Sequence, residues 1–398
     1  MSTMSAPPAA EPGAPTGGYS RLMAVVAAAF VLESALFSTL AALLPHYEEK
    51  FDLSTFGSGI LAGCYSGGMV VGILVAGLWV SDRLGVRRTA LTGCTMLALS
   101  SLAFGAASSL AALEVARLVQ GIGAGLVWCS LLNWLIAMVP PSSRGAALGA
   151  AMGAGVFGMA AGPLLGAATQ AIGTFTVFAA VAASLVVYMF ILARTPSPAA
   201  AGTVRRESSR LRLPKDPRMR RVIALVTVPP LIAAAVITIV PLQLDDLGAS
   251  EAAIDAALLV GALLSAVCCV YAGNFADARG HFWPVILGAL ACVLTLAAMA
   301  AADTVLAISL AFIIFESLGL GFFWIPLMSL FTERGEALNM EPATVALLLN
   351  LAITLAYTLG PPLLTGVQEA ASVSAAYLAM VGLTLVAMGG LWVSRRVD

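Results

Sequence analysis

Apolar residues along this chain gather in long runs that are separated by short polar stretches. The runs are close to 20 residues long, the length at which a helix crosses about 30 Å of hydrocarbon. Inside a bilayer a helix satisfies its own backbone hydrogen bonds. The pattern therefore predicts twelve membrane-spanning helices, at 21–44, 58–80, 89–109, 111–138, 146–168, 174–194, 222–244, 256–275, 282–301, 304–330, 343–367 and 372–394.

Composition agrees with this interpretation. Of the 398 residues, 60% are hydrophobic and only 10% are charged, and the mean hydropathy is +0.97. A soluble domain carries about 25% charged residues. We expect an all-α polytopic membrane protein with a disordered Pro-, Ala- and Gly-rich N-terminus at 1–20. The first span is interpreted as a retained helix, because no basic segment or cleavage site flanks it.

The distribution of Lys and Arg predicts the orientation. Of the 20 basic residues, Lys50 lies in the first loop and Arg117 inside a span, and the remaining 18 lie at the termini, in even-numbered loops or in the 195–221 connector. Basic loops stay in the cytoplasm. We therefore expect a cell (inner or plasma) membrane protein with both termini and the connector in the cytoplasm, 395–398 forming the C-terminal tail. Lipid binding is the alternative role for the basic connector.

The connector divides the chain into two six-helix halves, 21–194 and 222–394, that look like repeats. Four features recur at nearly one offset. Pro45, which we expect to end the first span, precedes Pro241 by 196 residues, and "QGIGAGLVW" at 120–128 precedes "ESLGLGFFW" at 316–324 by the same number. Asp82 and Asp277 are 195 apart, and the Gly-Pro pairs at 162 and 360 are 198 apart.

The loop after the second span, "GLWVSDRLGVRRTAL", resembles the loop 2–3 signature of the major facilitator superfamily. The matching residues are Gly77, Asp82, Arg83, Gly85, Arg87 and Arg88, although the leading Gly stands one position early and Val86 replaces a basic residue. The second half has a degraded copy in "GNFADARGH", at Gly273, Asp277, Arg279 and Gly280. "RLVQGIGAG" in span 4 resembles the buried-arginine motif of the family. The resemblance implies twelve helices as two six-helix pseudo-repeats, with Asp82 and its basic neighbours as a latch.

Residues 149–168, "GAAMGAGVFGMAAGPLLGAA", contain six glycines and a proline in an apolar run. Small residues allow close helix packing in membranes, and we expect a tightly packed helix that bends near Pro163. The run also resembles the span 5 signature of the drug/proton antiporters of that family. Its matching residues are Gly149, Gly158, Gly162, Pro163 and Gly166, whereas Ala167 replaces the last Gly. The resemblance implies export, and plain helix packing is the alternative.

Charged residues inside spans are functional candidates, because each costs at least about 2.5–3.5 kcal/mol at mid-membrane. Glu33 is the first candidate: it lies about twelve residues from either end of span 1. Burial disfavours the charged form of a carboxyl, so Glu33 could exchange a proton when water or a cationic substrate arrives. The alternative is a carboxyl satisfied by its neighbours without a role in transport.

Arg117 stays charged and needs an acidic partner or a polar cavity; by resemblance it is a coupling residue. Glu114, one helical turn away, is the nearest acidic candidate in the sequence. Its alternative is a carboxylate at the solvated outer interface that does not pair with Arg117. Glu316 occupies the repeat position of Gln120 and is a rival proton carrier, with a structural hydrogen-bonding role as its alternative. Neutral polar contacts are expected from Gln120, Asn133, Asn350 and Tyr357.

Several classes of chemistry find no support in the sequence. No Gly-Lys-Ser/Thr phosphate loop, nucleophile–base pair or metal-ligand spacing is present, and the six Cys are scattered through the spans. We expect no enzyme activity, cofactor, metal or nucleic-acid partner. The expected partners are a small-molecule substrate, protons and the bilayer, and the expected state is a monomer.

Together these features favour a secondary active transporter that exports amphipathic or cationic small molecules against inward proton flow, by alternating access. Proton-coupled uptake of a small metabolite is a second hypothesis. A third, of another class, is a membrane sensor or scaffold that does not transport.

Overall fold

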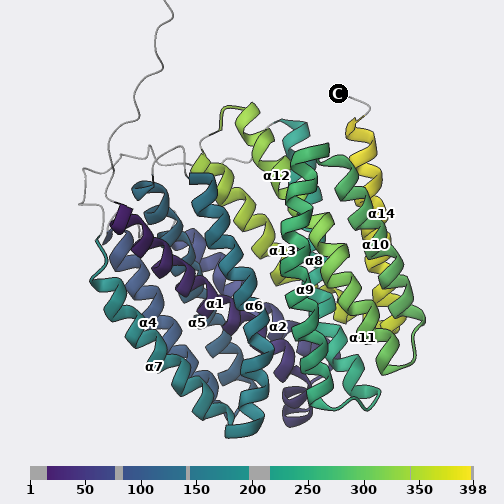
Figure 1. The fold of residues 1–398 in the computed structure, drawn as a ribbon. Coiled ribbons are helices and arrows are strands. Elements are labelled where there is room, and N and C mark those ends of the chain that lie inside the picture. The colour runs from purple at the N-terminus through teal and green to yellow at the C-terminus, as the bar shows by residue number, and fades with distance from the viewer. Residues whose placement is uncertain (1–15, 77–83, 140–143, 197–215, 341, 396–398) are drawn as a thin grey trace, which may run out of the picture.

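The computed structural model describes residues 16–76, 84–139, 144–196, 216–340 and 342–395, and these are helical almost throughout (Figure 1). The helices are α1 (Thr16–Phe51), α2 (Thr55–Val75), α4 (Val86–Gly105), α5 (Leu110–Met138), α6 (Arg144–Ile172), α7 (Thr174–Ala193), α8 (Pro217–Asp246), α9 (Glu251–Arg279), α10 (Phe282–Ala301), α11 (Val305–Ile314), the π-helix η3 (Phe315–Leu320), α12 (Gly321–Ala337), α13 (Pro342–Ala370) and α14 (Val373–Arg395).

Each predicted span corresponds to a helix, since α11, η3 and α12 follow one another without a break and form one rod. Among the described residues, eleven helices are long and apolar enough to cross a membrane. The remaining one, α4, has the length of a span but begins with Arg87 and Arg88 and carries several Ser and Thr residues. Its polar side chains lower its hydropathy, while its neighbours α5 and α7 cover much of its surface.

Two expectations about α1 are wrong. Residues 16–20 belong to the helix rather than to a disordered tail, and Pro45 does not end it, because α1 continues to Phe51. Proline lacks an N–H and therefore leaves the carbonyl four residues earlier without its helical partner. In α1 that carbonyl belongs to Ala41, which lines the two cavities described below. Lys50 consequently lies in the last turn of a helix and not in a loop.

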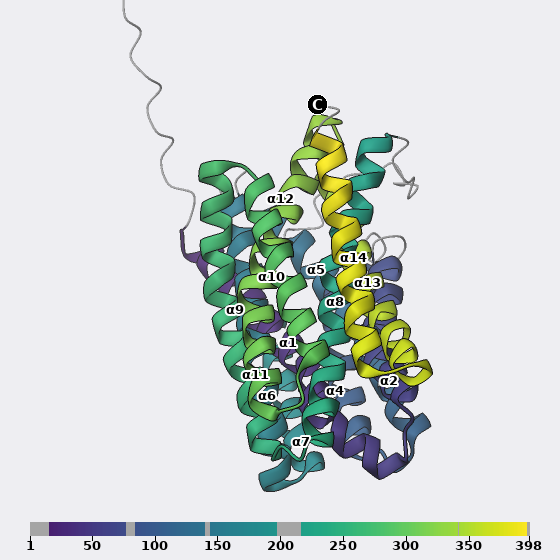
Figure 2. The ribbon, with the colours of Figure 1, turned by 90° about the vertical axis from the view of Figure 1, so that its right-hand side faces the viewer.

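The buried apolar side chains form two clusters. One is built almost entirely from α1 to α7, and the other from α8 to α14, with Leu242 and Ala42 as the members that cross from one half of the chain to the other. In Figure 1 the purple-to-teal helices accordingly stand beside the green-to-yellow ones, which lie in front of them in Figure 2. The chain thus has the all-α major facilitator architecture that the resemblance implied.

Successive helices run in opposite directions, so the connections lie on two faces. The odd-loop face holds 52–54, 106–109, 173, 247–250, 302–304 and 371–372. The even-loop face holds the C-terminal end of α14, at the top of Figure 1, and the connection between α9 and α10 at Gly280–His281.

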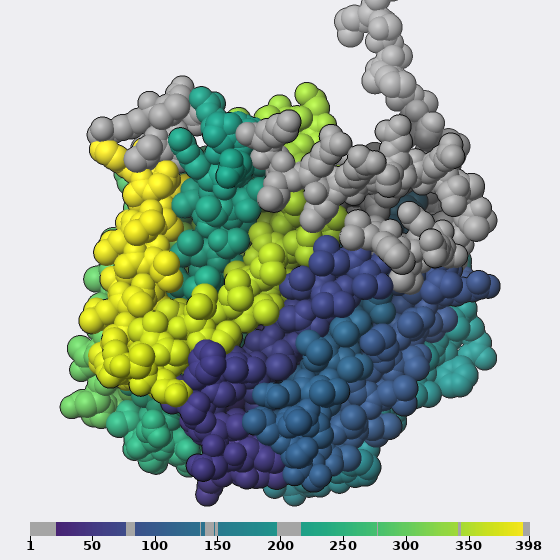
Figure 3. All heavy atoms as spheres, turned by 180° about the vertical axis from the view of Figure 1, so that it is seen from behind, coloured from purple at the N-terminus to yellow at the C-terminus, as the bar shows by residue number. Residues whose placement is uncertain are grey.

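Contacts of α2 with α13 and of α6 with α9 form most of the junction between the halves, and α1 also meets α8 there. Figure 3 shows the first pair as a diagonal seam between the purple-blue and yellow-green surfaces. Glycines allow backbone contact at this seam: a Cβ on Gly63 would stand 2.6 Å from the Thr358 carbonyl oxygen, and one on Gly59 would collide with Thr365. At the odd-loop end the Phe56 N–H donates to Glu369 at 2.7 Å.

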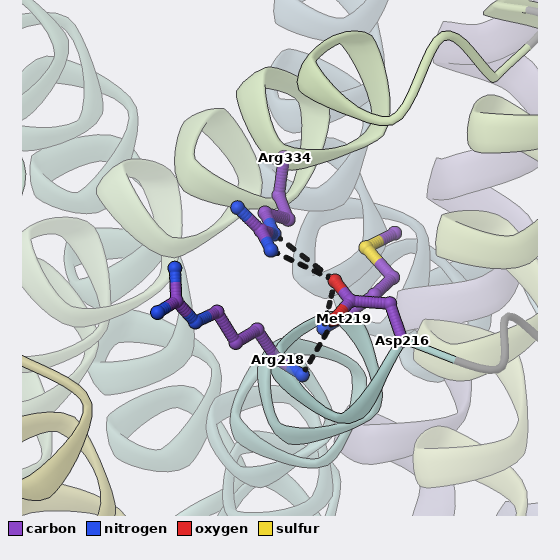
Figure 4. Close-up of polar contacts among 4 residues, drawn as sticks. All are labelled: Asp216, Arg218, Met219 and Arg334. Carbon is purple, nitrogen blue, oxygen red and sulfur yellow. Dashed lines mark hydrogen bonds and ion pairs between the residues drawn. The ribbon is translucent and has the colours of Figure 1, made fainter. Parts of the chain in front are cut away.

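On the even-loop face, Asp216 ties α8 to α12 (Figure 4). Its carboxylate caps the N-terminus of α8 by accepting from the N–H groups of Arg218 and Met219, and Arg334 of α12 donates to its Oδ2 at 2.9 and 3.2 Å. Desolvation opposes these contacts, but they prevail and lower the pKa of Asp216. Glu333 precedes Arg334 on α12, and its carboxylate lies 2.7 Å from His281 Nε2.

Candidate functional site

Glu33 is buried inside the first half of the chain, with 5% of its surface exposed. Its carboxylate accepts hydrogen bonds from the Tyr65 hydroxyl at 3.0 Å and the Ser34 hydroxyl at 3.3 Å. Tyr65 comes from α2 and is itself fully buried. In this conformation Glu33 is therefore a partnered carboxyl behind the wall of the central cavities rather than part of their lining.

Arg117 of α5 binds α1 through backbone carbonyls. Its guanidinium donates to the Leu36 oxygen at 2.9 Å and the Phe37 oxygen at 3.1 Å, and it lies 4.7 Å from the centre of the Tyr65 ring. Among the described residues no carboxylate pairs with it in an ion pair. The hydroxyl of Tyr65 thus binds Glu33 while its ring faces Arg117, and one tyrosine connects the two charges.

The remaining span 4 candidates have different positions. Gln120 accepts from Arg117 at 3.3 Å and donates to Ser101 of α4, which extends the network to a third helix. Glu114 is partly exposed near the odd-loop end of α5, as the interfacial alternative expects. Asn133 donates a hydrogen bond to Cys129, one turn earlier on its own helix, at 3.7 Å.

The glycines of α6 pack against α1. A Cβ on Gly158 would stand 2.5 Å from the Val31 oxygen, one on Gly162 would meet Ser38, and one on Gly166 would meet Ala42. Gly153 has nothing within 4 Å of such a position, and for Gly149 only its place in α6 is described. The close approach explains why positions 158, 162 and 166 are glycines.

Pro163 lies inside α6, which continues to Ile172. The proline removes the helical partner of the Met159 carbonyl, and the Ser38 hydroxyl donates to that oxygen at 2.9 Å. Pro163 therefore makes the Met159 carbonyl oxygen available as an acceptor on the face of α6 that meets α1.

Glu316 lies in η3, the π-helical turn in the middle of the α11–α12 rod. π-Helical turns are rare and are frequent at functional sites. Its side chain lines a central cavity of about 30 Å³ between the two halves, and no described residue donates a hydrogen bond to its carboxylate. The other walls come from α1, α6, α8, α9 and α11, at Ser38, Ala41, Val156, Met159, Pro163, Ile237, Leu258, Ala262, Ser265 and Phe312.

A second cavity of about 30 Å³ adjoins the first and shares Ser38, Ala41 and Ile237 with it. Arg117 and Tyr357 line it from opposite halves. Aromatic rings cross the interface here: Phe37 contacts Tyr65 at 5.5 Å and Tyr357 at 5.4 Å between ring centres, and Tyr357 contacts Trp324 at 5.9 Å. Each cavity has room for about one water molecule, so a drug-sized ligand would require the halves to separate.

Asn350 of α13 bonds to the opposite half. Trp128 of α5 donates its indole N–H to the Asn350 side-chain oxygen at 3.2 Å, and the indole stacks on Phe30 with 4.0 Å between ring centres. Besides the Phe56–Glu369 contact, this is a second hydrogen bond between the halves within the described part of the chain.

The predicted loop 2–3 signature is described only from Gly85 onward, because Gly77, Asp82 and Arg83 lie outside the described residues. Gly85 has φ +77° and ψ 156°, a conformation essentially restricted to glycine. Arg87 donates to the Thr195 carbonyl beyond α7 at 2.6 Å, while Arg88 is exposed.

The second-half copy has the same backbone feature. Gly280 has φ +80° and ψ 166°, close to the values of Gly85 at the corresponding place. Arg279 stacks on Phe275, 5.1 Å from the ring centre, and Gly273 has open space around it. Asp277 lies in α9, and nothing is described of its side chain. The shared glycine conformation supports the internal repeat.

Sequence reasoning did not identify several residues of this region. Tyr65, Trp128 and Trp324 look like ordinary span residues, and only their tertiary contacts connect them to Glu33, Asn350 and Tyr357. Asp255 lies at the predicted edge of a span, where a carboxylate is unremarkable, yet only 7% of its surface is exposed.

A sequence profile of the Major Facilitator Superfamily matches residues 26–339. The chain belongs to the major facilitator superfamily. Members of this superfamily are membrane transporters and not enzymes, and the chain is accordingly a multi-pass membrane protein.

The chain is similar to parts of several superfamily members. It is 35% identical over 115 residues to the MFS-type transporter ppzB of Metarhizium majus, covering 29% of this chain and 25% of that protein. It is 32% identical over 137 residues to the tetracenomycin C resistance and export protein of Streptomyces glaucescens, covering 34% and 25%. It is 26% identical over 128 residues to the arabinose-proton symporter of Bacillus subtilis, covering 32% and 27%. The matches thus span about a quarter of the length of these relatives.

Similarity of fold extends over nearly the whole chain. A bacterial homologue of the human lysosomal transporter Spinster, in an inward-facing and unoccupied conformation, aligns with a TM-score of 0.76 over 96% of this chain and 98% of that one. At 15% identity this similarity concerns the fold alone.

Proposed function

We propose that this chain is a secondary active transporter that exports amphipathic, cationic small molecules in exchange for protons. The observation that carries the proposal is the position of Glu316 on a π-helical turn that lines the cavity between the halves, where no described residue donates a hydrogen bond to its carboxylate. Glu316 is half-buried, and a charge that is partly withdrawn from water and has no partner is unfavourable. Either a proton or a cationic ligand at Glu316 would relieve this cost, which makes binding of the two competitive.

Aromatic side chains around the cavities favour an amphipathic cation. Phe37, Tyr357 and Trp324 present ring faces and edges close to the second cavity. Cations are attracted to aromatic faces, and the apolar remainder of the ligand would replace water on the surrounding Ala, Ile and Leu side chains. Separation of the α6–α9 or α2–α13 contacts would enlarge the site on one side of the membrane at a time.

Glu33 is proposed as the second proton-binding carboxyl, connected through Tyr65 to Arg117. The Tyr65 hydroxyl can donate to an ionised Glu33 or reorient when Glu33 is protonated. Because Arg117 holds the carbonyls of Leu36 and Phe37, a change at Glu33 would be transmitted to the part of α1 that lines both cavities. Proton movement across 100 mV supplies about 2.3 kcal/mol per charge.

Direction and orientation complete the proposal. The α6 glycines resemble the signature of drug/proton antiporters except at Ala167, and one of the relatives is named as a resistance and export protein. The termini would be cytoplasmic in the cell membrane, the protein would act as a monomer, and Asp82 would latch the even-loop side. Proton-coupled uptake remains the second candidate, since another relative is named as an arabinose-proton symporter.

The test is a proton-flux measurement in proteoliposomes. A lipophilic cation is added outside vesicles with an acidic lumen that contains a pH-sensitive dye, and cation uptake is followed in parallel. Exchange predicts that cation entry makes the lumen more alkaline. Symport predicts that it becomes more acidic.

A neutral drug, an organic anion and arabinose are compared with the cation, and protein-free vesicles correct for passive leakage. A response to the anion alone would remove the cation assignment. Arabinose-driven acidification would establish the uptake alternative, and no flux with any compound would favour a sensor or scaffold.

A further inference from the structure

A buried carboxylate, Asp255, occupies the contact between α6 and α9 near the odd-loop face. It lies in the second turn of α9, and 7% of its surface is exposed. Its Oδ2 has no hydrogen-bond partner among the described residues. Its Oδ1 faces α6, 3.6 Å from the place where a Cβ on Gly166 would stand, and Ala42 of α1 closes the same spot.

Asp255 shares a face of α9 with the lining of the central cavity. Leu258, Ala262 and Ser265 follow it at spacings of three and four residues, which keep side chains on one side of a helix, and all three line the cavity with Glu316. Gly166 stands in the same relation to Pro163 and Met159 on α6. Asp255 therefore lies between the cavity and the odd-loop face, one turn of α9 beyond the cavity wall.

The titratable group that interacts electrostatically with Asp255 is acidic, and the exposed His46 lies one turn beyond Ala42 on α1. Glu251 precedes it by one turn on α9 and interacts with it electrostatically, and Glu251 in turn interacts with Asp245 at the end of α8. Asp245 also interacts electrostatically with Asp246 and with Glu49 at the end of α1. Neither α6 between 147 and 172 nor α11 carries a titratable side chain. Lys50 of α1 lies over the Tyr47 and Phe51 rings.

An ionised Asp255 would thus be buried without a hydrogen bond on one oxygen, without a positive partner and beside like charges. Burying such a charge is costly, and neutralisation removes most of the cost. No organic cation would fit beside it, because Gly166 and Ala42 already approach as closely as glycine permits. A proton is the ligand of suitable size.

We propose that Asp255 is a proton-binding site at the odd-loop end of the transport path, and that α6 and α9 close there only when it is occupied. The carboxylate takes its proton from water on the odd-loop side while the two helices are apart, and no other bond forms or breaks. Acid on that side then favours the closed contact, and ionisation favours hydration and separation. The inference rests on the proposed alternating access for its role in transport.

The experiment measures closure directly. Spin labels are attached to cysteines introduced at the exposed Ala171 and Ala252, one on each helix, in a chain whose six native cysteines are replaced. The distance distribution is recorded in nanodiscs from acidic to alkaline pH. The closed-to-open ratio should fall as pH rises, by up to about tenfold per pH unit for a single linked proton.

Asp255→Asn, which is almost isosteric and permanently neutral, should remain closed at every pH. Glu251→Gln is the matched control: it removes an exposed carboxylate one turn away and should preserve the pH-dependent transition. An Asp255→Asn variant that titrates like the parent chain would overturn the proposal, and so would a parent chain whose distance does not respond to pH.

Infrared spectroscopy gives a second readout that does not depend on motion. The parent chain should show a protonated-carboxyl C=O band at acidic pH that is reduced in Asp255→Asn, and an unchanged band would contradict the assignment. Because neither readout requires a substrate, the site can be confirmed even if the flux assay shows no cation export. Conversely, export can be confirmed while Asp255 fails this test.

Discussion

Glu33 and Glu316 are both single carboxylates deep in apolar helices, and the structure gives them opposite surroundings. Glu33 accepts two hydroxyl hydrogen bonds and lies next to the Tyr65–Arg117 pair. Within the described part of the chain Glu316 has no hydrogen-bond donor; it lies on a π-helical turn and lines the cavity. The first half of the chain thus holds an internal polar network, and the second half presents an unpaired charge to the space between the halves.

The difference separates two roles that the sequence had combined in Glu33. A carboxyl that is already hydrogen-bonded loses those bonds when a ligand displaces them, so it suits proton storage and conformational coupling. An unpaired carboxyl breaks no hydrogen bonds when a cation binds, so the whole attraction contributes to binding. We therefore expect cation binding at Glu316 and proton coupling through Glu33.

Neutralising each carboxylate in turn tests the two roles directly. Glu316→Gln should weaken binding of the lipophilic cation by about tenfold or more, since it removes the charge that attracts the cation, and opposite unit charges about 4 Å apart attract by about 4 kcal/mol at an effective dielectric constant of about 20. Glu33→Gln should bind the cation normally but lose proton-driven transport, while downhill movement of neutral compounds continues. Glu33→Asp should keep part of the coupling. Equilibrium binding and proton flux are measured on all three.

Two outcomes would contradict the roles assigned to Glu33 and Glu316. If Glu33→Gln pumps normally and Glu316→Gln does not, both proton and cation belong to the second half. If Glu33→Gln loses cation binding and Glu316→Gln keeps it, the two roles are exchanged.

Replacing Arg117 tests the network behind Glu33. Arg117→Lys cannot reach the Leu36 and Phe37 carbonyls in the same forked geometry, and we expect a loss of about 1.5–3 kcal/mol of stability. Thermal unfolding in detergent and transport in vesicles should both decline. Arg88→Lys, at an exposed position of α4, is the control and should change neither. Parent-like stability of Arg117→Lys would mean that the carbonyl contacts contribute little.

Bulk on α6 should be tolerated only away from α1. Gly162→Leu places a side chain where Ser38 lies and should abolish folding or transport, and Gly162→Ala should be milder. Gly153→Leu points into open space on the same helix and should leave both nearly unchanged. Expression, gel-filtration profile and flux are compared for the three variants. Similar behaviour of the two Leu variants would contradict the packing account.

The hydrogen bond between the halves should contribute about 0.5–1.5 kcal/mol. Trp128→Phe keeps an aromatic ring beside Phe30 but removes the donor, and Asn350→Leu removes the acceptor. In a double-mutant cycle on thermal stability the two changes should be non-additive by this amount. Strict additivity would show that the contact is not maintained in the membrane.

The smallest effect should come from Asp216, which is on the surface of the second half. Its folded-state pKa is lowered, so its contribution to stability is present above the unfolded pKa and disappears as pH falls through the folded one. Asp216→Ala should lower the Tm by a few degrees at most near neutral pH, with the difference from the parent vanishing in acid. Asp216→Asn keeps an N-cap and should lose less. An effect that grows in acid would contradict this assignment.

The sequence alone determined the class of protein and the order of its helices. A run of about 20 apolar residues is stable in lipid as a membrane-spanning helix, because only a helix satisfies the backbone hydrogen bonds within the run itself. The Gly85 and Gly280 positions could likewise be predicted to matter, because only glycine adopts their backbone conformation without strain. Helix ends were less predictable, as α1 shows, since a proline within a membrane helix does not have to end it.

Only the tertiary structure decided which polar groups meet. Glu33 and Tyr65 are 32 residues apart, Trp128 and Asn350 are 222 apart, and no periodicity within a helix encodes either contact. Helices that are apolar on most sides can rotate and pair in many ways by composition alone. Their relative rotation is fixed by glycine faces and by a few hydrogen bonds between distant segments. That rotation turns Glu316 toward the cavity, places Glu33 behind its wall, and buries Asp255 where α6 meets α9.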